Sequence, residues 1–169
     1  MSTQTAPPQW LDADEQHAWR EFLHATRLLE AVLDRDLQAQ GLQLTEYEII
    51  SMLSEQPDRR LRMSEIAELV VQSRSRLTHT AGRLEKRGWV RREPCVGDRR
   101  GVELVLTDLG YAEIRRMAPI HVDGVRRNFV AHLSREDLLA LGRAMESVSR
   151  GIRSTGVCDD IRGAEEQPA

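Results

Sequence analysis

The chain has 169 residues, a formal net charge of −3 and an apolar share of 40%. This length suits one domain with appendages, and this composition excludes a chain that is disordered throughout. Every apolar run is broken by charge, the N-terminus lacks the features of a secretory signal, and two cysteines are too few for a disulfide framework. We therefore expect a cytoplasmic protein without a membrane span.

Charge is distributed unevenly along the chain. Residues 59–101 contain twelve of the 24 Lys and Arg but only five of the 27 Asp and Glu, so this segment carries +7 and the remainder carries −10. Such asymmetry suggests one surface that binds a polyanion on an otherwise acidic protein. The alternative is an arginine-rich face that is merely solvated.

The first predicted helix begins at Asp12. Asp12-Ala-Asp-Glu15 has the form of a capping box, and Gly41 offers a left-handed stop at the other end. Apolar side chains cover more of this helix than one buried face needs, which favours a helix shared with a second chain. We assign residues 1–11 to a flexible N-terminus and residues 12–44 to an N-terminal dimerisation helix.

The second predicted helix begins at Thr45. Thr45-Glu-Tyr-Glu48 has the form of a capping box, and Pro57 follows the expected end of the helix near Ser54. Residues 60–62 are predicted to form a brief strand.

Two further helices are predicted on either side of a tight turn at Val71-Gln72. The first spans Glu65 to Val70 and follows Ser64. The second follows Ser73, whose side chain is a preferred helix cap, and it stops at Gly88.

A hairpin and two long helices complete the chain. Residues 89–96 and 101–106 are extended runs around Gly97-Asp-Arg-Arg100, a pattern that predicts a two-stranded hairpin. Thr107 begins a long helix, and Ser134 begins a last helix with a stripe of apolar side chains at helical spacing.

Two short helices joined by a tight turn and followed by a hairpin make a winged helix-turn-helix. The predicted fold class is mostly α, with a minor β part. Residues 45–106 form the winged helix-turn-helix DNA-binding region, residues 107–153 form C-terminal dimerisation helices, and residues 154–169 form a flexible tail. Pairing of the long helices across a two-fold axis predicts a homodimer.

The helix predicted after Ser73 has the properties of a helix that enters the major groove. Its outer face has no acidic residue, and Gly82 permits close approach to a backbone. The alternative is an ordinary solvated face. The side chains expected to contact base edges lie near its start: Gln72, Ser73, Arg74, Ser75, Thr78 and His79.

Arginines around this helix are candidates for contacts with phosphates, which set affinity. The expected phosphate contacts are Arg62, Arg76, Arg83, Arg91, Arg92 and Arg99. We place Arg99 and Arg100 at the hairpin tip, where an arginine can insert into the minor groove. The Asp98 carboxylate can hold a neighbouring guanidinium in one pose.

Six stretches of the sequence resemble the multiple-antibiotic-resistance regulator (MarR) family. They are Leu44-Thr45-x-x-Glu48, Ser64-Glu-Ile-Ala67-x-x-Val70, Ser73-x-Ser75-x-Leu77-Thr78, Leu84-Glu85-x-x-Gly88-Trp89-Val90-x-Arg92, Gly97-Asp98-Arg99-Arg100 and Leu106-Thr107-x-x-Gly110. The resemblance implies a homodimer that binds a pseudo-palindromic operator in double-stranded DNA. It also implies that a small phenolic or lipophilic ligand weakens DNA binding.

We interpret the chain as a sequence-specific transcriptional regulator, and as a repressor. The alternative is an architectural or protein-interaction module that keeps the winged fold without useful sequence choice. Motifs typical of enzymes are absent from the sequence, so we expect neither catalysis nor a cofactor.

An effector pocket is a further hypothesis. Trp10, Trp19, His24 and Arg27 could line a site for an aromatic anion, with Arg27 pairing to a ligand carboxylate. Trp19 also fits the apolar stripe of its helix, so a place in the core is the alternative. The histidines show no metal-ligand spacing, and we predict no metal site. Cys95 lies among arginines, which is compatible with either a sensing or a spectator thiol.

Overall fold

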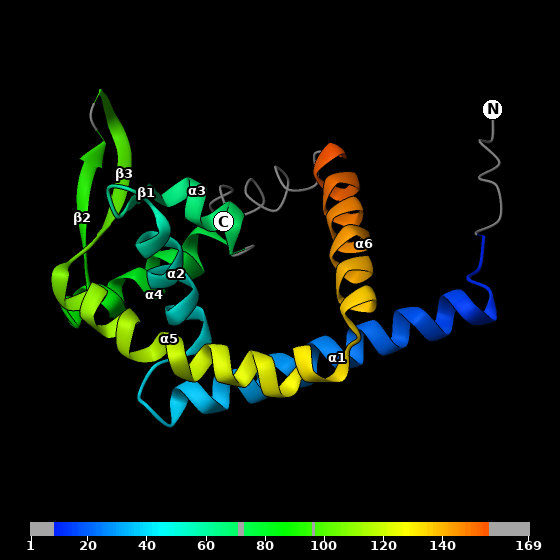
Figure 1. Cartoon of the computed structure of the whole chain (residues 1–169). Helices are drawn as coiled ribbons and strands as arrows, with labels where there is room; N and C mark the ends of the chain where they lie inside the picture. Colours follow the sequence, from blue (N-terminus) through cyan, green and yellow to red (C-terminus); the bar gives the residue numbers. More distant parts are fainter. Residues whose placement is uncertain (1–8, 71–72, 96, 156–169) are drawn as a thin grey trace, which may run out of the picture.

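Helices dominate the structure, and one small antiparallel sheet accompanies them (Figure 1). The computed structural model describes residues 9–70, 73–95 and 97–155. The predicted turn at Val71-Gln72 lies outside the described residues, as do residues 1–8 of the predicted N-terminus and residues 156–169 of the predicted tail. The elements in chain order are α1 (Ala13–Gln38), α2 (Leu44–Glu55), β1 (Arg60–Arg62), α3 (Met63–Leu69), α4 (Arg74–Lys86), β2 (Val90–Cys95), β3 (Asp98–Leu106), α5 (Asp108–Asn128), η1 (Val130–His132) and α6 (Arg135–Ser154).

The predicted fold class, mostly α with a winged helix-turn-helix, is confirmed. Local signals at the helix starts explain most of this agreement. Asp12 Oδ1 accepts from the backbone N–H of Glu15 at 2.8 Å, and Glu15 Oε2 accepts from Asp12 N–H at 2.9 Å, so the capping box of α1 forms as predicted. Thr107 and Ser134 cap α5 and α6, their hydroxyls accepting from the backbone N–H of Gly110 and of Asp137.

The start of α2 differs from the prediction. The helix begins at Leu44, and Glu46 rather than Glu48 reaches back, accepting from Gln43 N–H at 3.1 Å. The reason is a contact from outside the segment: Asp34 Oδ1 of α1 accepts from Leu44 N–H at 2.8 Å. A helix N–H that gains this distant partner no longer needs a cap from Thr45.

The sheet has the order β1-β3-β2, and both pairs of strands are antiparallel. The β2–β3 hairpin projects from the rest of the chain and forms the wing (Figure 1). Its turn is shorter than predicted, because the backbone from Asp98 to Arg100 already belongs to β3 and Asp98 pairs with Cys95. An irregularity in the register between Pro94 and Cys95 accompanies this early pairing, and Gly97 has a positive φ of 82°. The prediction that Arg99 and Arg100 form the turn itself is therefore wrong.

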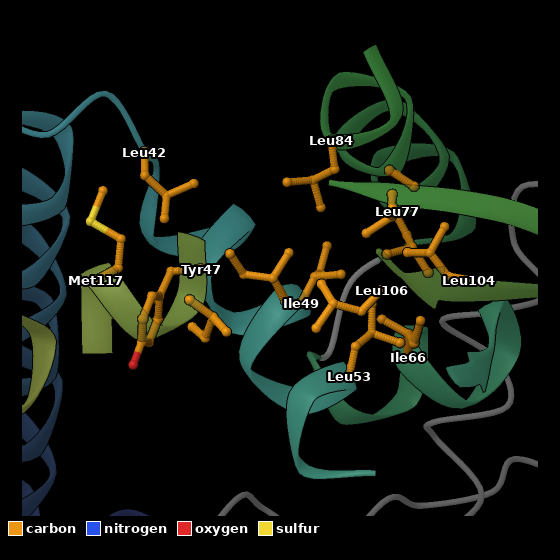
Figure 2. Packing of buried hydrophobic residues seen from close by; sticks show 14 of the residues in the cluster. Leu42, Tyr47, Ile49, Leu53, Ile66, Leu77, Leu84, Leu104, Leu106 and Met117 are labelled. Carbon is orange, nitrogen blue, oxygen red and sulfur yellow. The ribbon is translucent and has the colours of Figure 1, made fainter. Parts of the chain in front are cut away.

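The hydrophobic core lies within the winged domain, which we define as α2 to β3, and extends to the adjoining ends of α1 and α5. Figure 2 shows Ile49 and Leu53 of α2 facing Ile66 of α3 and the sheet, with Leu77 and Leu84 of α4 above them. Leu37 of α1 and Met117 of α5 are also fully buried. The core therefore fixes α4 and the wing relative to the ends of the two long helices.

The long helices extend well beyond this core. α5 lies alongside α1, and α6 rises away from both (Figure 1). In α1 only Leu33 and Leu37 are buried, and α6 has no buried residue. Apolar side chains remain exposed on both helices, among them Trp19 and Phe22 on α1 and Val148 and Ile152 on α6. None of the helices in the described ranges is long and apolar enough to cross a membrane.

Candidate nucleic-acid interface

The central element of the interface is α4, the second helix of the helix-turn-helix. Ser73 caps it by accepting from Arg76 N–H at 3.3 Å. The apolar side chains of Leu77, Ala81 and Leu84 are buried on its inner face. Because the inner face of α4 packs against the core, the opposite face of the helix must point toward solvent.

The outer face of α4 is polar and open to solvent, as predicted. Ser75, Thr78 and His79 are exposed there, and Arg76 is exposed without an ion pair to any described residue. The predicted contact Gln72 lies outside the described residues. Arg74 is the first residue of α4, and its side chain is likewise outside the description.

Arg62 stands where β1 ends and α3 begins, and it reaches the wing. Its Nη1 donates to Asp98 Oδ2 at 3.2 Å. This partner of Asp98 lies 36 residues earlier in the sequence. The expected contact between Asp98 and a neighbouring arginine stays a prediction, because the side chains of Arg99 and Arg100 lie outside the described residues. The contact joins the start of α3 to the start of β3, so the wing and the helix-turn-helix are linked at their exposed edge.

Arg91 lies on β2 and pairs with a carboxylate of its own strand. Its Nε donates to Glu93 Oε1 at 2.5 Å, and this hydrogen bond lowers the pKa of Glu93. Glu93 and Glu103 face each other across the β2–β3 ladder, and Arg60 Nη1 donates to both, at 3.4 and 3.3 Å. Two like charges in opposed positions would repel, so Arg60 stabilises this part of the wing.

Arg92 connects the wing to α4. Its Nη2 donates to the backbone oxygen of Thr78 at 2.9 Å, and its Nη1 donates to Glu85 Oε2 at 3.2 Å. The backbone N–H of Arg92 also donates to Glu85 Oε1 at 3.2 Å. Both ends of this guanidinium therefore hold α4 against β2.

Arg83 points toward the start of α2 and away from the outer face. Its Nε donates to Glu46 Oε1 at 2.9 Å, and its Nη2 donates to Gln43 Oε1 at 2.8 Å. Glu46 is 1% exposed and was missed by the sequence analysis. The sequence gives little sign of this role, because Gln43 is not among the residues that favour the N-cap position.

Four of the six expected phosphate contacts thus have carboxylate partners within the chain: Arg62, Arg83, Arg91 and Arg92. Ion pairs between exposed side chains are weak, so Arg62 and Arg91 can exchange their carboxylates for phosphates. The backbone of Arg99 and Arg100 runs in β3, and their side chains lie outside the description.

The predicted effector residues lie on the surface of the chain. Trp10, Trp19, His24 and Arg27 are all exposed, and the Trp19 ring stacks on Phe22 with centroids 6.1 Å apart. With 51% of its surface exposed, Trp19 is outside the core of the chain. A cavity of about 510 Å³ lies between α3, α4 and the wing, lined by Met63, Leu77 and Val102 among others.

Neither metal ligation nor an exposed thiol marks this surface. The described residues contain no group of three His, Cys, Asp or Glu that could hold a metal ion. Cys95 is free and buried, with its Sγ beside Gly101. The candidate interface consists of the outer face of α4, the start of α3 and the wing, and this arrangement defines a winged helix-turn-helix DNA-binding protein.

Comparisons with known proteins agree with this class. Residues 40–101 match the MarR family. Sco3205, a MarR family transcriptional regulator from Streptomyces coelicolor solved in complex with DNA, is 47% identical with a TM-score of 0.81, and the match covers 87% of this chain and 92% of that one. The HTH-type transcriptional regulator PecS from Dickeya dadantii (strain 3937) is 33% identical over 126 residues, 74% of this chain and 75% of PecS.

The transcriptional repressor MprA from Escherichia coli (strain K12) is 35% identical over 100 residues, which are 59% of this chain and 57% of MprA. These similarities, together with the fold, establish the family. The chain belongs to the MarR family and is a DNA-binding transcriptional regulator.

Proposed function

We propose that the protein is a repressor that binds a pseudo-palindromic operator as a homodimer and is released by a small aromatic or lipophilic ligand. The observation that carries this proposal is the outer face of α4, where Ser75, Thr78 and His79 are exposed on a helix whose other face is buried. Side chains of this kind near a helix start read base edges in the major groove. The similarity to the repressor MprA supports repression as the direction of control.

Exposed apolar surface on α1 and α6 supports the homodimer. Val148 and Ile152 of α6 are each about half exposed within one chain, and Trp19 and Phe22 of α1 are similarly open. Exposed apolar residues that follow one helical stripe are typical of an interface. A second copy that buries these stripes would present two α4 helices, and two-fold operators read by such pairs have half-sites about 10 base pairs apart.

DNA contacts divide into two groups in this proposal. Residues from the start of α4, with Arg74 among them, set sequence choice, and the arginines of the wing and of α3 set affinity. Arg76 is the best candidate for a phosphate contact, because it is exposed and already without a carboxylate partner among the described residues. Its guanidinium has no ion pair with a described residue to break before it binds DNA.

The first experiment measures binding by fluorescence anisotropy, using DNA from upstream of the protein's own gene and a random duplex, across a salt series. We expect tight binding to the upstream DNA, a steep salt slope, and an affinity ratio of about 10³ or more over random DNA. Weak binding that ignores sequence would favour the alternative, a winged architectural or protein-interaction module.

The effector hypothesis needs its own test. We expect a phenolic carboxylate, with 4-hydroxybenzoate as the probe, to bind near Trp19 and Arg27 where a second chain covers them. Calorimetry with wild type and Arg27→Ala measures the loss of the carboxylate contact. Arg20→Ala, two helical turns away on the same helix, is the matched control. Equal affinity in Arg27→Ala and wild type would contradict the assignment.

A further inference from the structure

The loop between α1 and α2 is held by the second half of α4 through two arginines. Arg83 donates to both Glu46 and Gln43, and Arg87 Nη1 donates to the backbone oxygen of Gly41 at 2.8 Å. Arg87 Nη2 also lies 3.9 Å from Glu46 Oε2. Arg83 lies in the last turn of α4, and Arg87 is the C-cap residue four positions further on, so both side chains project toward the same side at the end of this helix.

Glu46 is the centre of this cluster, and its burial makes the contacts obligatory. Its side chain is 1% exposed, and its two oxygens accept from Gln43 N–H at 3.1 Å and from Arg83 Nε at 2.9 Å. A buried carboxylate without such partners is strongly unfavourable, so α4 cannot rotate or slide here without disrupting the pairing.

The same loop is tied back to α1. Asp34 of α1 accepts from Leu44 N–H at 2.8 Å through Oδ1 and from Gln38 Nε2 at 2.5 Å through Oδ2. A continuous series of hydrogen bonds therefore runs from Asp34 through the start of α2 to Glu46 and then to Arg83. This series connects a terminal helix to the helix that faces DNA.

We propose that Glu46 and Arg83 are positioning residues that fix the orientation of α4 relative to α1 and thereby determine which half-site spacing the dimer accepts. The proposal rests on the proposed function, because spacing has meaning only for a dimer on a two-fold operator. Arg83 then acts inside the protein, through Glu46 and Gln43, and contributes no phosphate contact. Its loss widens the range of spacings that are bound.

The test uses full-length protein and the best duplex from the upstream DNA, with versions in which the half-sites are moved one base pair closer or farther apart. Wild type, Glu46→Gln, Arg83→Ala and the double variant are compared by anisotropy across a salt series. Arg76→Ala is the matched control, because it lies on the same helix and is exposed. Thermal melts establish that each variant is folded.

For Glu46→Gln and Arg83→Ala we expect the preference for the native spacing to fall by about threefold to tenfold, as one or two lost hydrogen bonds predict. Their salt slopes should equal that of wild type, and the double variant should show no greater loss than Arg83→Ala alone. Arg76→Ala should do the opposite, lowering the salt slope by about one and leaving the spacing preference unchanged.

Either of two results would overturn this proposal and leave the proposed function standing. One is an unchanged spacing preference in Glu46→Gln. The other is a salt slope lowered by about one in Arg83→Ala, which would make Arg83 a phosphate contact. Where Glu46→Gln or Arg83→Ala does not fold, Gln43→Ala replaces it, because it removes an exposed acceptor of Arg83 and leaves Glu46 in place. It should widen the spacing in the same direction, and an unchanged preference would refute the proposal. A wild type without any selective duplex would instead refute the proposed function.

Discussion

Substitution of Gly110 by alanine should destabilise the protein because the new methyl group has no room. Gly110 lies in the first turn of α5, and a Cβ there would be 2.1 Å from the backbone oxygen of Trp89 and 2.7 Å from Leu106 Cδ1. Carbon and oxygen atoms in the closest favourable contacts are about 3.3 Å apart, so the Trp89 carbonyl would have to move by roughly 1 Å. That carbonyl accepts from Thr107 N–H at 3.0 Å and from Thr107 Oγ1 at 3.1 Å, which opposes the movement.

The expected magnitude follows from these contacts. Overpacking of this kind lowers stability by about 1–3 kcal/mol, and weakening two hydrogen bonds adds about 2 kcal/mol. The better helix propensity of alanine offsets about 1 kcal/mol. The net loss of about 2–4 kcal/mol corresponds to a Tm lowered by roughly 4–16 °C for a chain of this size.

Urea unfolding followed by far-UV circular dichroism, at matched protein concentrations, measures this change. Gly82→Ala is the control, since its Cβ would meet only Arg92 Nη2, at an ordinary 3.9 Å. This second glycine-to-alanine change in a helix should raise stability by about 0.5–1 kcal/mol. A Gly110→Ala protein as stable as wild type would refute the reasoning, because it would show that the Trp89 carbonyl moves freely.

Three further outcomes are expected. Arg99→Ala should weaken binding to specific and random duplexes alike and lower the salt slope by about one, and an unchanged slope would count against a phosphate contact from the wing. Val148→Glu should convert the dimer into monomers in light scattering, whereas Ser147→Glu, an equal charge change off the apolar stripe, should not; a dimeric Val148→Glu would contradict the α6 interface. Burial lowers the pKa of His121, whose Nδ1 has no hydrogen-bond partner among the described residues, so the neutral form is favoured in the folded state. The stability that this provides is complete above the unfolded pKa of about 6.5 and decreases as the pH falls below it. We therefore expect the Tm of wild type to drop between pH 7.5 and pH 5.5, and the Tm of His121→Gln to drop less steeply. Identical pH profiles of Tm in the two proteins would refute the assignment.

Sequence reasoning succeeded where the cause of a structure is local. Ser73 caps α4 because its hydroxyl reaches a backbone N–H three residues ahead, and this spacing is visible in the sequence. The inner face of α4 has a similarly local cause, since Leu77, Ala81 and Leu84 follow the helical period. The hairpin was found from its turn residues, although a register irregularity at Pro94 and Cys95 moved the turn.

The partners of Arg83 and Arg62 could not be predicted, because they come from distant parts of the chain. Arg83 binds a glutamate 37 residues away, and Arg62 binds an aspartate 36 residues away. A sequence shows that such arginines are present, and their charge then suggests DNA contacts. Only the packing of α4 against α2, and of the wing against α3, reveals which guanidiniums already have carboxylate partners. The base contacts and the effector residues stay predictions.

The hydrophobic core of the winged domain is complete within one chain, whereas α6 has no buried residue. This contrast has a consequence for the regulation of genes. Two copies can separate while each winged domain stays folded, because its buried leucines and isoleucines need no partner. In the proposed dimer, subunit exchange then requires that the apolar stripes on α1 and α6 come apart, not that the whole protein unfolds. A related chain with a compatible stripe could replace one subunit and form a mixed dimer with two different recognition helices. Such mixed dimers would bind asymmetric operators. Two genes would then specify three binding preferences, one for each homodimer and one for the mixed dimer.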